Sequence, residues 1–260
     1  MIPTNLLILA VGGLCAGILA GFLGIGGGTI MVPLLLALGY QPIQAVATSA
    51  LAITITASSG TLQNWRMGYI KPKRVLLLAL PALFTAQVGV YLAQKFSSTL
   101  LLLGFGSLML VNIYLVELRK RVIAKHKDAE NNGEKRQGAN PTIARIITGG
   151  TAGLLAGLFG VGGGVIMIPL QILLLGEPIK AAIRTSLGVI VVTSISAAFG
   201  HYLNGNVLFV EGLCLGFAGL ISAQISTRFL PKLPSSVVSF AFRTLLVILA
   251  IYTFWKAWQV

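Results

Sequence analysis

The chain has 260 residues, of which 56% are hydrophobic and only 10% are charged. A soluble domain of this length cannot bury so large an apolar fraction, so the composition excludes an ordinary soluble protein and predicts one embedded in a lipid bilayer. The net charge of +13 does not indicate a nucleic-acid partner, because the Lys and Arg residues gather between apolar runs, as they do in cytoplasmic loops of membrane proteins.

Apolar runs of about the length of a membrane span recur along the chain. The first lacks a basic segment before it and a soluble domain after it, so we interpret it as a membrane helix and not as a signal peptide. Each run is long enough to cross a hydrocarbon layer of ~30 Å as a helix. We therefore expect an all-α polytopic membrane protein with helices near residues 5–23, 43–63, 75–94, 98–116, 142–159, 185–202, 208–229 and 236–255.

The chain contains an internal repeat. Residues 17–34 recur at 153–170 with twelve of the eighteen positions identical, and weaker matches extend the repeat over nearly the whole chain. The polar, charged stretch between the copies lacks apolar periodicity, which is typical of a solvated linker. We predict a first transmembrane repeat at 1–118, a basic cytoplasmic linker at 119–141 and a second transmembrane repeat at 142–260, each repeat with about four to five helical segments.

The placement of charge predicts how the repeats are oriented. The loop from Arg66 to Arg74 and the linker are rich in Lys and Arg, so both should face the cytoplasm. The matching loop, from His201 to Gly212, has neither and carries Glu211, so it should face outward. Corresponding loops then lie on opposite sides, which makes an inverted-topology repeat, a construction common among secondary transporters. Both termini are expected outside.

A short apolar piece, at 29–38 and again at 165–175, follows each dense cluster of glycines. Ten or so helical residues span roughly half of the hydrocarbon layer. Each piece is therefore either a half-helix or the return leg of a re-entrant hairpin, and both alternatives preserve the inverted symmetry.

The glycines occur in two patterns. Those spaced four apart give a helix one flat face that another helix can approach closely. They are Gly13, Gly17 and Gly21, and Gly149, Gly153 and Gly157. The denser clusters that follow should break the helix and free backbone groups. A dinucleotide-type phosphate loop is excluded, because it needs a strand before the glycines and an acidic residue about 20 positions later, and neither copy has them.

The two breaks are candidate anion sites. Irregular backbone at membrane depth is tolerated only where it is buried or lines a cavity. The helix that starts after each break would present free N–H groups and the positive end of its dipole, which suits an anion. The alternative is a tight interhelical turn with no ligand. The residues concerned are Gly26, Gly27, Gly28, Thr29, Gly162, Gly163 and Gly164.

The doubled motif G-x-x-G-[IV]-G-G-G-x-[IV]-[MV]-[IV]-P, followed by A-x-x-T-S, resembles the TauE/SafE family of sulfite and organosulfonate permeases. The resemblance covers both halves. It implies a multi-pass transporter of the cytoplasmic (inner) membrane that moves small sulfur-containing anions, such as sulfite, sulfoacetate or related organosulfonates, often outward. It does not fix which anion is carried.

Polar residues repeated in both halves are further candidates. Hydroxyl and amide groups can hold an oxyanion without a fixed charge, but they can also bond to a helix carbonyl, and an amide deep in an apolar run must find some partner. These candidates are Thr48, Ser49, Thr185, Ser186, Gln87 and Gln224.

Two ionisable residues differ between the repeats. Arg184 precedes the second Thr-Ser pair where the first copy has Ala47, and it could attract an anion from the cytoplasm or extend to the membrane surface. His201 matches Asn64, and it could couple transport to protons or serve as a hydrogen-bonded helix end.

The remaining chemistry disfavours other functions. None of the six acidic residues lies centrally in an apolar run, so a carboxylate-lined cation site is hard to build and an anion substrate fits better. With two unpaired cysteines and two histidines we expect no enzyme activity, no metal site and no cofactor. We predict a secondary transporter that exports small sulfur-containing anions by alternating access; the alternatives are an anion channel and, less favoured, an intramembrane enzyme.

Overall fold

The computed structural model describes residues 2–111, 114 and 140–258, and in these ranges the chain forms helices and short connections but no strand. The first half contains α1 (Ile2–Leu23), α2 (Gly28–Ala37), α3 (Pro42–Arg66), α4 (Pro72–Lys95) and a helix at Ser98–Val111. The second half contains α6 (Pro141–Phe159), α7 (Gly164–Leu175), α8 (Ile179–Leu203), α9 (Phe209–Phe229), a short 3-10 helix (Leu230–Lys232) and α10 (Ser235–Trp258). The predicted all-α class is confirmed.

The predicted apolar runs are helices, although their bounds differ. The largest difference is α8, which begins at Ile179 and not near residue 185. Lys180 and Arg184 interrupt the apolar run but not the helix, because long cationic side chains can extend along a helix to the membrane surface. Most of the predicted linker, 119–141, lies outside the described residues.

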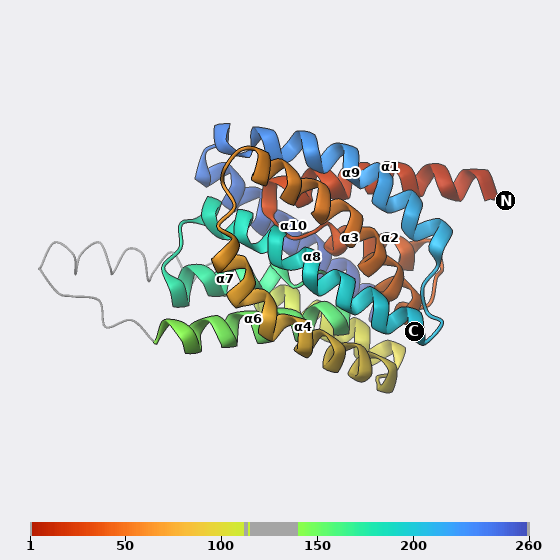
Figure 1. Cartoon of the computed structure of the whole chain (residues 1–260). Helices are drawn as coiled ribbons and strands as arrows, with labels where there is room; N and C mark the ends of the chain where they lie inside the picture. Colours follow the sequence, from red (N-terminus) through yellow and green to blue (C-terminus); the bar gives the residue numbers. More distant parts are fainter. Residues whose placement is uncertain (1, 112–113, 115–139, 259–260) are drawn as a thin grey trace, which may run out of the picture.

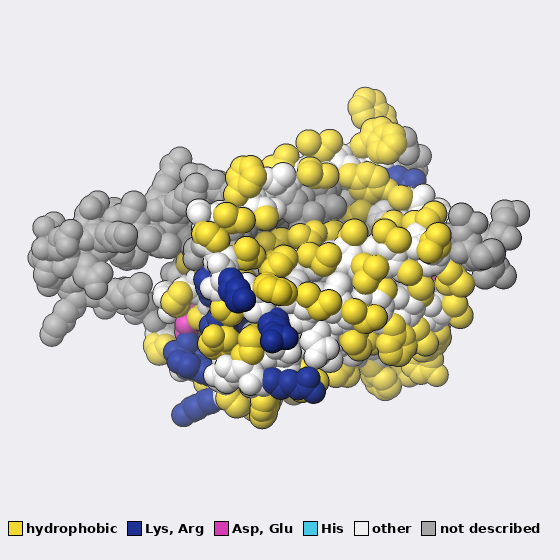
Figure 2. All heavy atoms as spheres, turned by 90° about the horizontal axis from the view of Figure 1, so that it is seen from above, with side chains coloured by type: hydrophobic (Ala, Val, Ile, Leu, Met, Phe, Trp, Pro, Cys, Tyr) yellow, Lys and Arg dark blue, Asp and Glu magenta, His cyan; other side chains and the backbone are white. Residues whose placement is uncertain are grey.

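Six of the described helices are long and apolar enough to cross a membrane: α1, α3, α4, α6, α8 and the stretch Phe209–Lys232. Large apolar side chains point outward from them; Phe84 and Phe217, for example, are 69% and 58% exposed. Figure 2 shows hydrophobic side chains over most of one face, with Lys and Arg gathered toward one end. An apolar surface of this extent is that of a polytopic membrane protein.

The most extensive helix packing is between the two halves. α1 runs along α9, α4 runs along α6, and the central helices α3 and α8 are in contact between these two pairs. Figure 1 shows that α1 and α6 begin at opposite ends of the bundle, and that both chain termini lie at the end where α1 begins.

The flat glycine faces predicted from the four-residue spacing lie at these pairings. A Cβ placed on Gly17 would lie 2.3 Å from the carbonyl oxygen of Gly219 in α9, and a Cβ on Gly153 would lie 2.1 Å from that of Ala82 in α4. Only hydrogen fits in such spaces, so the interpretation of these glycines as a packing surface is confirmed.

The short helices after the glycine clusters turn back along the helices before them. A Cβ on Gly27 would lie 3.0 Å from the carbonyl oxygen of Ala16, and a Cβ on Gly12 would meet the side chain of Leu34, so α2 runs antiparallel to α1. In the same way Gly163, at the start of α7, lies against Ala152 of α6. Of the two alternatives left open by the sequence, the structure therefore shows the return leg of a hairpin.

Candidate functional site

Each hairpin turns at a break whose backbone requires glycine. Gly26 and Gly27 have φ of 75° and 87°, and Gly162 and Gly163 have φ of 75° and 76°. This left-handed region is costly for other L-residues but open to glycine. Gly24 and Gly160, which end α1 and α6, also have positive φ. The dense glycine clusters thus allow a tight reversal in a buried position.

The two breaks touch each other directly. A Cβ on Gly28 would lie 2.5 Å from the carbonyl oxygen of Gly160, and a Cβ on Gly164 would lie 2.4 Å from that of Gly24. The start of each returning helix therefore abuts the end of the outgoing helix in the other half. Because both contacts are backbone to backbone, any larger residue would push the two hairpins apart.

The contact lies near the middle of the bundle. Cβ atoms on Gly26 and Gly162 would each meet the side chains of both Ile53 and Ile190. These isoleucines lie near the midpoints of the 25-residue helices α3 and α8, and both are fully buried. The site is thus covered by apolar side chains from the two central helices.

The predicted serines each bridge to the break of the opposite half. The Ser49 hydroxyl, on α3, donates to the carbonyl oxygen of Gly160 at 2.6 Å, and the Ser186 hydroxyl, on α8, donates to that of Gly24. Both side chains are fully buried. In this arrangement the hydroxyls satisfy the carbonyls that the broken helices leave free, as helix termini require.

The predicted threonines have different surroundings. Thr48 is buried and its hydroxyl accepts a hydrogen bond from the backbone N–H of Leu208 at 3.1 Å. Thr185 is also buried, at the matching position of α8. Thr29, in the first turn of α2, is fully buried and its hydroxyl oxygen has no hydrogen-bond partner in the described part of the chain. Such a group is expensive to bury, so Thr29 is the polar group at the breaks most in need of a partner.

Of the two predicted glutamines, Gln87 bonds to a helix and not to the glycine breaks. The Gln87 amide donates to the backbone carbonyl of Ser196 at 2.6 Å and to its hydroxyl at 2.8 Å, so it ties α4 to α8. Gln224 is half-buried at the corresponding place on α9. Of the two partners considered from sequence, a helix group or a ligand, Gln87 takes the helix group in this structure.

Arg184 and His201 lie near opposite ends of α8. The Arg184 guanidinium stacks 3.6 Å from the ring centre of Tyr69, and its Nε has no hydrogen-bond partner among the described residues. His201 is fully buried, with Nε2 3.0 Å from the carbonyl oxygen of Gly157, one turn before the second break. Because the carbonyl can only accept, Nε2 carries the proton in this contact. Nδ1 has no hydrogen-bond partner in the part of the chain that the structure describes.

Sequence reasoning missed one side chain at the breaks and two contacts at the ends of the bundle. The Thr193 hydroxyl of α8 donates to the carbonyl oxygen of Gly162 at 3.2 Å. Arg74 forms an ion pair with Glu177, and the Tyr40 hydroxyl donates to Glu211 at 3.2 Å. The repeat could have indicated these two contacts, because their members occupy matching positions in the two halves.

The chain is, by fold and site, a polytopic helical membrane protein built on two glycine-broken hairpins that meet in its centre. The chain belongs to the sulfite exporter TauE/SafE family, which matches residues 9–253. The resemblance seen in the doubled glycine motif is therefore confirmed over both halves.

Three relatives of this chain are similar to it over most of their length. The chain is 30% identical over 248 residues to a protein of Bacillus subtilis called probable membrane transporter protein YunE, with 88% of this chain and 91% of that protein covered. A probable membrane transporter protein of Xylella fastidiosa is 27% identical, covering 99% of this chain and 97% of its own length. Another, MJ0441 of Methanocaldococcus jannaschii, is 30% identical, with 76% and 73% covered. The family and these names indicate a membrane transporter.

Proposed function

We propose that the chain is a secondary transporter that moves small sulfur-containing anions, such as sulfite, sulfoacetate or a related organosulfonate, outward across the cytoplasmic membrane. The observation that carries the proposal is the backbone contact between the two glycine breaks, Gly28 against Gly160 and Gly164 against Gly24, near the midpoints of α3 and α8. The family description, sulfite exporter, names the substrate class.

The substrate site is the junction of the two breaks. No side chain caps the start of α2 or α7 in the described structure, so the N–H groups of the first turns and the positive helix ends are directed at the junction. When the hairpins separate, the serine hydroxyls released from the glycine carbonyls and the unpartnered hydroxyl of Thr29 donate to the oxyanion. The proposed binding residues are Gly26, Gly27, Gly28, Thr29, Thr48, Ser49, Gly162, Gly163, Gly164, Thr185 and Ser186, with Gln87 and Gln224 on the paths from the junction.

Alternating access follows from an inverted repeat. Two observations support that arrangement: α1 and α6 begin at opposite ends of the bundle, and they pack on α9 and α4, which occupy matching places in the two halves. Halves related in this way can exchange conformations, so the junction opens first to one side and then to the other. The basic end of the bundle is the cytoplasmic end in this proposal, and both termini lie outside.

Two side chains are proposed to assist. Arg184, held over Tyr69 near the basic end, attracts the anion from the cytoplasm. His201 is buried near the other end, and its Nδ1 has no partner within the described ranges; this nitrogen accepts the proton that couples transport to pH. The matching residue in the first half is Asn64, which cannot titrate.

Counterflow in proteoliposomes tests the function. Vesicles loaded with unlabelled sulfite or sulfoacetate receive labelled tracer outside, with sulfate, chloride and empty vesicles as comparisons. We expect transient accumulation of tracer that is selective for sulfite or a sulfonate. Failure of every sulfur anion to accumulate, with reconstitution verified, would reject the proposed substrate class. The main alternative function is an anion channel. A channel would show anion flux in the same vesicles but no counterflow.

A further inference from the structure

At each end of the bundle, a contact between two side chains, one of them a carboxylate, joins the two halves. At the basic end, Arg74 in the first turn of α4 pairs with Glu177, which precedes α8. At the other end, the Tyr40 hydroxyl, in the connection before α3, donates to the carboxylate of Glu211 in the first turn of α9. Each contact therefore links the exit of one hairpin to the opposite half.

The two contacts are equivalent under the repeat. Tyr40 and Glu177 each follow a Leu-Gly pair that ends a returning helix, and both of those glycines have positive φ. Arg74 and Glu211 are each the third residue of the next matching helices, α4 and α9. The same position in the fold is thus occupied twice, once at each end, but by different chemistry.

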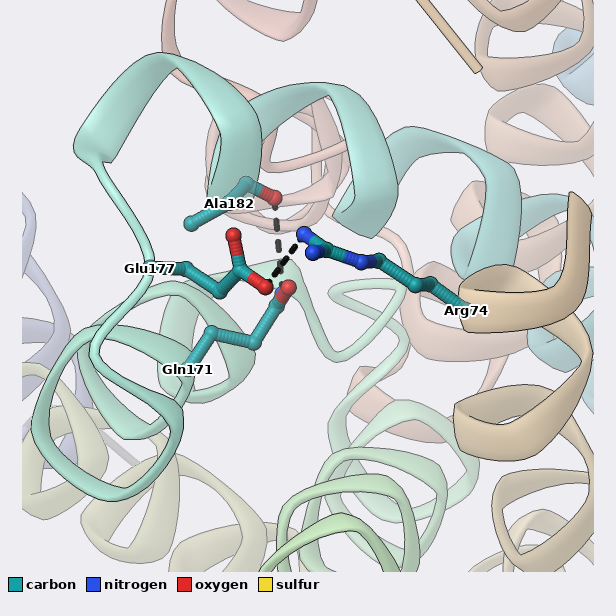
Figure 3. A network of polar contacts seen from close by, with 4 residues as sticks. All are labelled: Arg74, Gln171, Glu177 and Ala182. Atoms are coloured by element: carbon teal, nitrogen blue, oxygen red, sulfur yellow. Dashed lines mark hydrogen bonds and ion pairs between the residues drawn. The ribbon is translucent and has the colours of Figure 1, made fainter. Parts of the chain in front are cut away.

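At the basic end the contact is an ion pair within a group of cations. Figure 3 shows the Arg74 guanidinium reaching the Glu177 carboxylate, with the Gln171 side chain beside them and bonded to the carbonyl oxygen of Ala182. Arg74 is 40% exposed and Glu177 is 18% exposed, so solvent and solutes reach the guanidinium. Arg184 lies nearby on the same α8, stacked on Tyr69.

At the other end the contact contains no cation. Burial and the adjacent Glu211 carboxylate raise the pKa of Tyr40 above its ordinary value of 10.0, so the phenol stays protonated and donates. An anion that approaches this end meets a carboxylate, which repels it, and not a guanidinium. An anion at the basic end meets Arg74, whose present partner is itself an oxyanion.

We propose that Arg74–Glu177 and Tyr40–Glu211 are the inner and outer gates of the transporter, and that a small oxyanion opens the inner gate by replacing the Glu177 carboxylate on Arg74. This rests on the proposed transport function. Sulfite and sulfonates carry anionic oxygens that can accept hydrogen bonds from a guanidinium, as a carboxylate does. The anion and the Glu177 carboxylate are therefore similar ligands for Arg74. Because the outer gate offers an anion no such cation, the pair favours entry from the inside.

Cysteine accessibility tests the gates without requiring transport. In protein with Cys15 and Cys214 replaced by serine, Thr185→Cys reports from behind the inner gate and Thr48→Cys from the matching place behind the outer gate. We expect Glu177→Gln to speed labelling at position 185 from the cytoplasmic side about fivefold or more, and to leave position 48 unchanged, because loss of one charge-assisted contact shifts a two-state equilibrium. Tyr40→Phe should speed labelling at position 48 and leave position 185 unchanged. Lys95→Gln is the control: it removes an exposed cation that belongs to neither gate, and it should change labelling at neither position.

The second arm tests the exchange of anions. Sulfite or sulfoacetate on the cytoplasmic side should speed labelling at position 185 in the parent protein, add nothing in Glu177→Gln, and have no effect in Arg74→Gln. If Glu177→Gln changes neither reporter, or changes both equally, the gate proposal is overturned. If it changes only position 185 but sulfite, sulfoacetate and sulfate never do, the gates stand and exchange on Arg74 is overturned. Counterflow with the protein that lacks only Cys15 and Cys214, and so keeps Thr48 and Thr185, reports separately on the proposed function.

Discussion

At the level of single residues, the centre of this molecule depends on very small groups placed against backbone. Ser49 and Ser186 donate to carbonyls of the opposite breaks, and Gly28 and Gly164 leave room for those carbonyls to approach. The repeated motifs indicated these residues as candidates for an anion site. The sequence could not show that the serine hydroxyls donate to backbone carbonyls in this structure, since a hydroxyl can donate to a carbonyl or to an oxyanion equally well.

Removing one serine hydroxyl should destabilise the junction. Ser186→Ala leaves the carbonyl of Gly24 without its donor in a fully buried place, so we expect a loss of about 1–3 kcal/mol in the free energy of unfolding and a lower melting temperature in detergent. Ser49→Ala should behave alike. Ser58→Ala is the matched control, because Ser58 is exposed and its hydroxyl donates to the Thr54 carbonyl of its own helix. This variant should melt like the parent protein.

The histidine gives a second prediction at this scale. His201→Asn places at this position the residue that the first half carries at Asn64, so the fold has already accommodated it once. We propose His201 as the proton site, so exchange by the variant should lose the dependence on pH that the parent protein shows. Tracer exchange measured from acidic to neutral pH decides the matter, and an unchanged pH profile would assign His201 to packing alone.

At the level of the helices, close approach through glycine sets which elements pair. Gly13 and Gly17 of α1 meet backbone carbonyls of α9, and Gly149 and Gly153 of α6 meet those of α4. The four-residue spacing predicted flat faces correctly, because that spacing follows directly from helix geometry. It did not predict which helix each face would meet, since any helix with small residues is a candidate partner.

Substitution of two nearby glycines of α6 can separate the effect of helix packing on stability from the effect of helix propensity. In Gly153→Ala the new Cβ would lie 2.1 Å from the carbonyl oxygen of Ala82, so α4 and α6 must move apart, at a cost of about 1–3 kcal/mol. In Gly150→Ala the nearest atom is the Thr85 methyl at 3.7 Å, so the variant should be as stable as the parent or slightly more so. Thermal unfolding of both proteins in one detergent provides the measurement; equal midpoints would contradict the packing account.

The hairpins show where prediction from sequence stopped. A ten-residue apolar segment is long enough for either a half-helix or the return leg of a hairpin, so the sequence left open its direction relative to the preceding helix. Its direction comes from contacts such as Gly27 with Ala16, between residues that the sequence pattern does not single out as partners. The missing part of the prediction was thus tertiary packing and not local helix formation.

At the level of the whole molecule, orientation in the membrane is the property most open to a direct test. Gly68 and Gly205 occupy matching loops, both have positive φ near 70°, and a side chain at either would meet nothing within 4 Å. In protein without Cys15 and Cys214, we expect an impermeant maleimide to label Gly205→Cys in intact cells, but Gly68→Cys only after permeabilisation. The two variants carry the same backbone strain, so each controls for the other. Labelling of both in intact cells would exclude the inverted orientation.

Because helices of the first half pack mainly on helices of the second half, the fold also affects how the protein is synthesised and inserted into the membrane. α1 packs along α9, and the Gly24 carbonyl at the end of α1 accepts a hydrogen bond from Ser186 of α8. α1 therefore leaves the ribosome before its main partners have been made. Until those helices are synthesised, the first hairpin resides in the membrane with its glycine face and broken turn uncovered. Biogenesis therefore depends on keeping an unfinished half in the bilayer, without aggregation or degradation, for the time that translation of the second half requires.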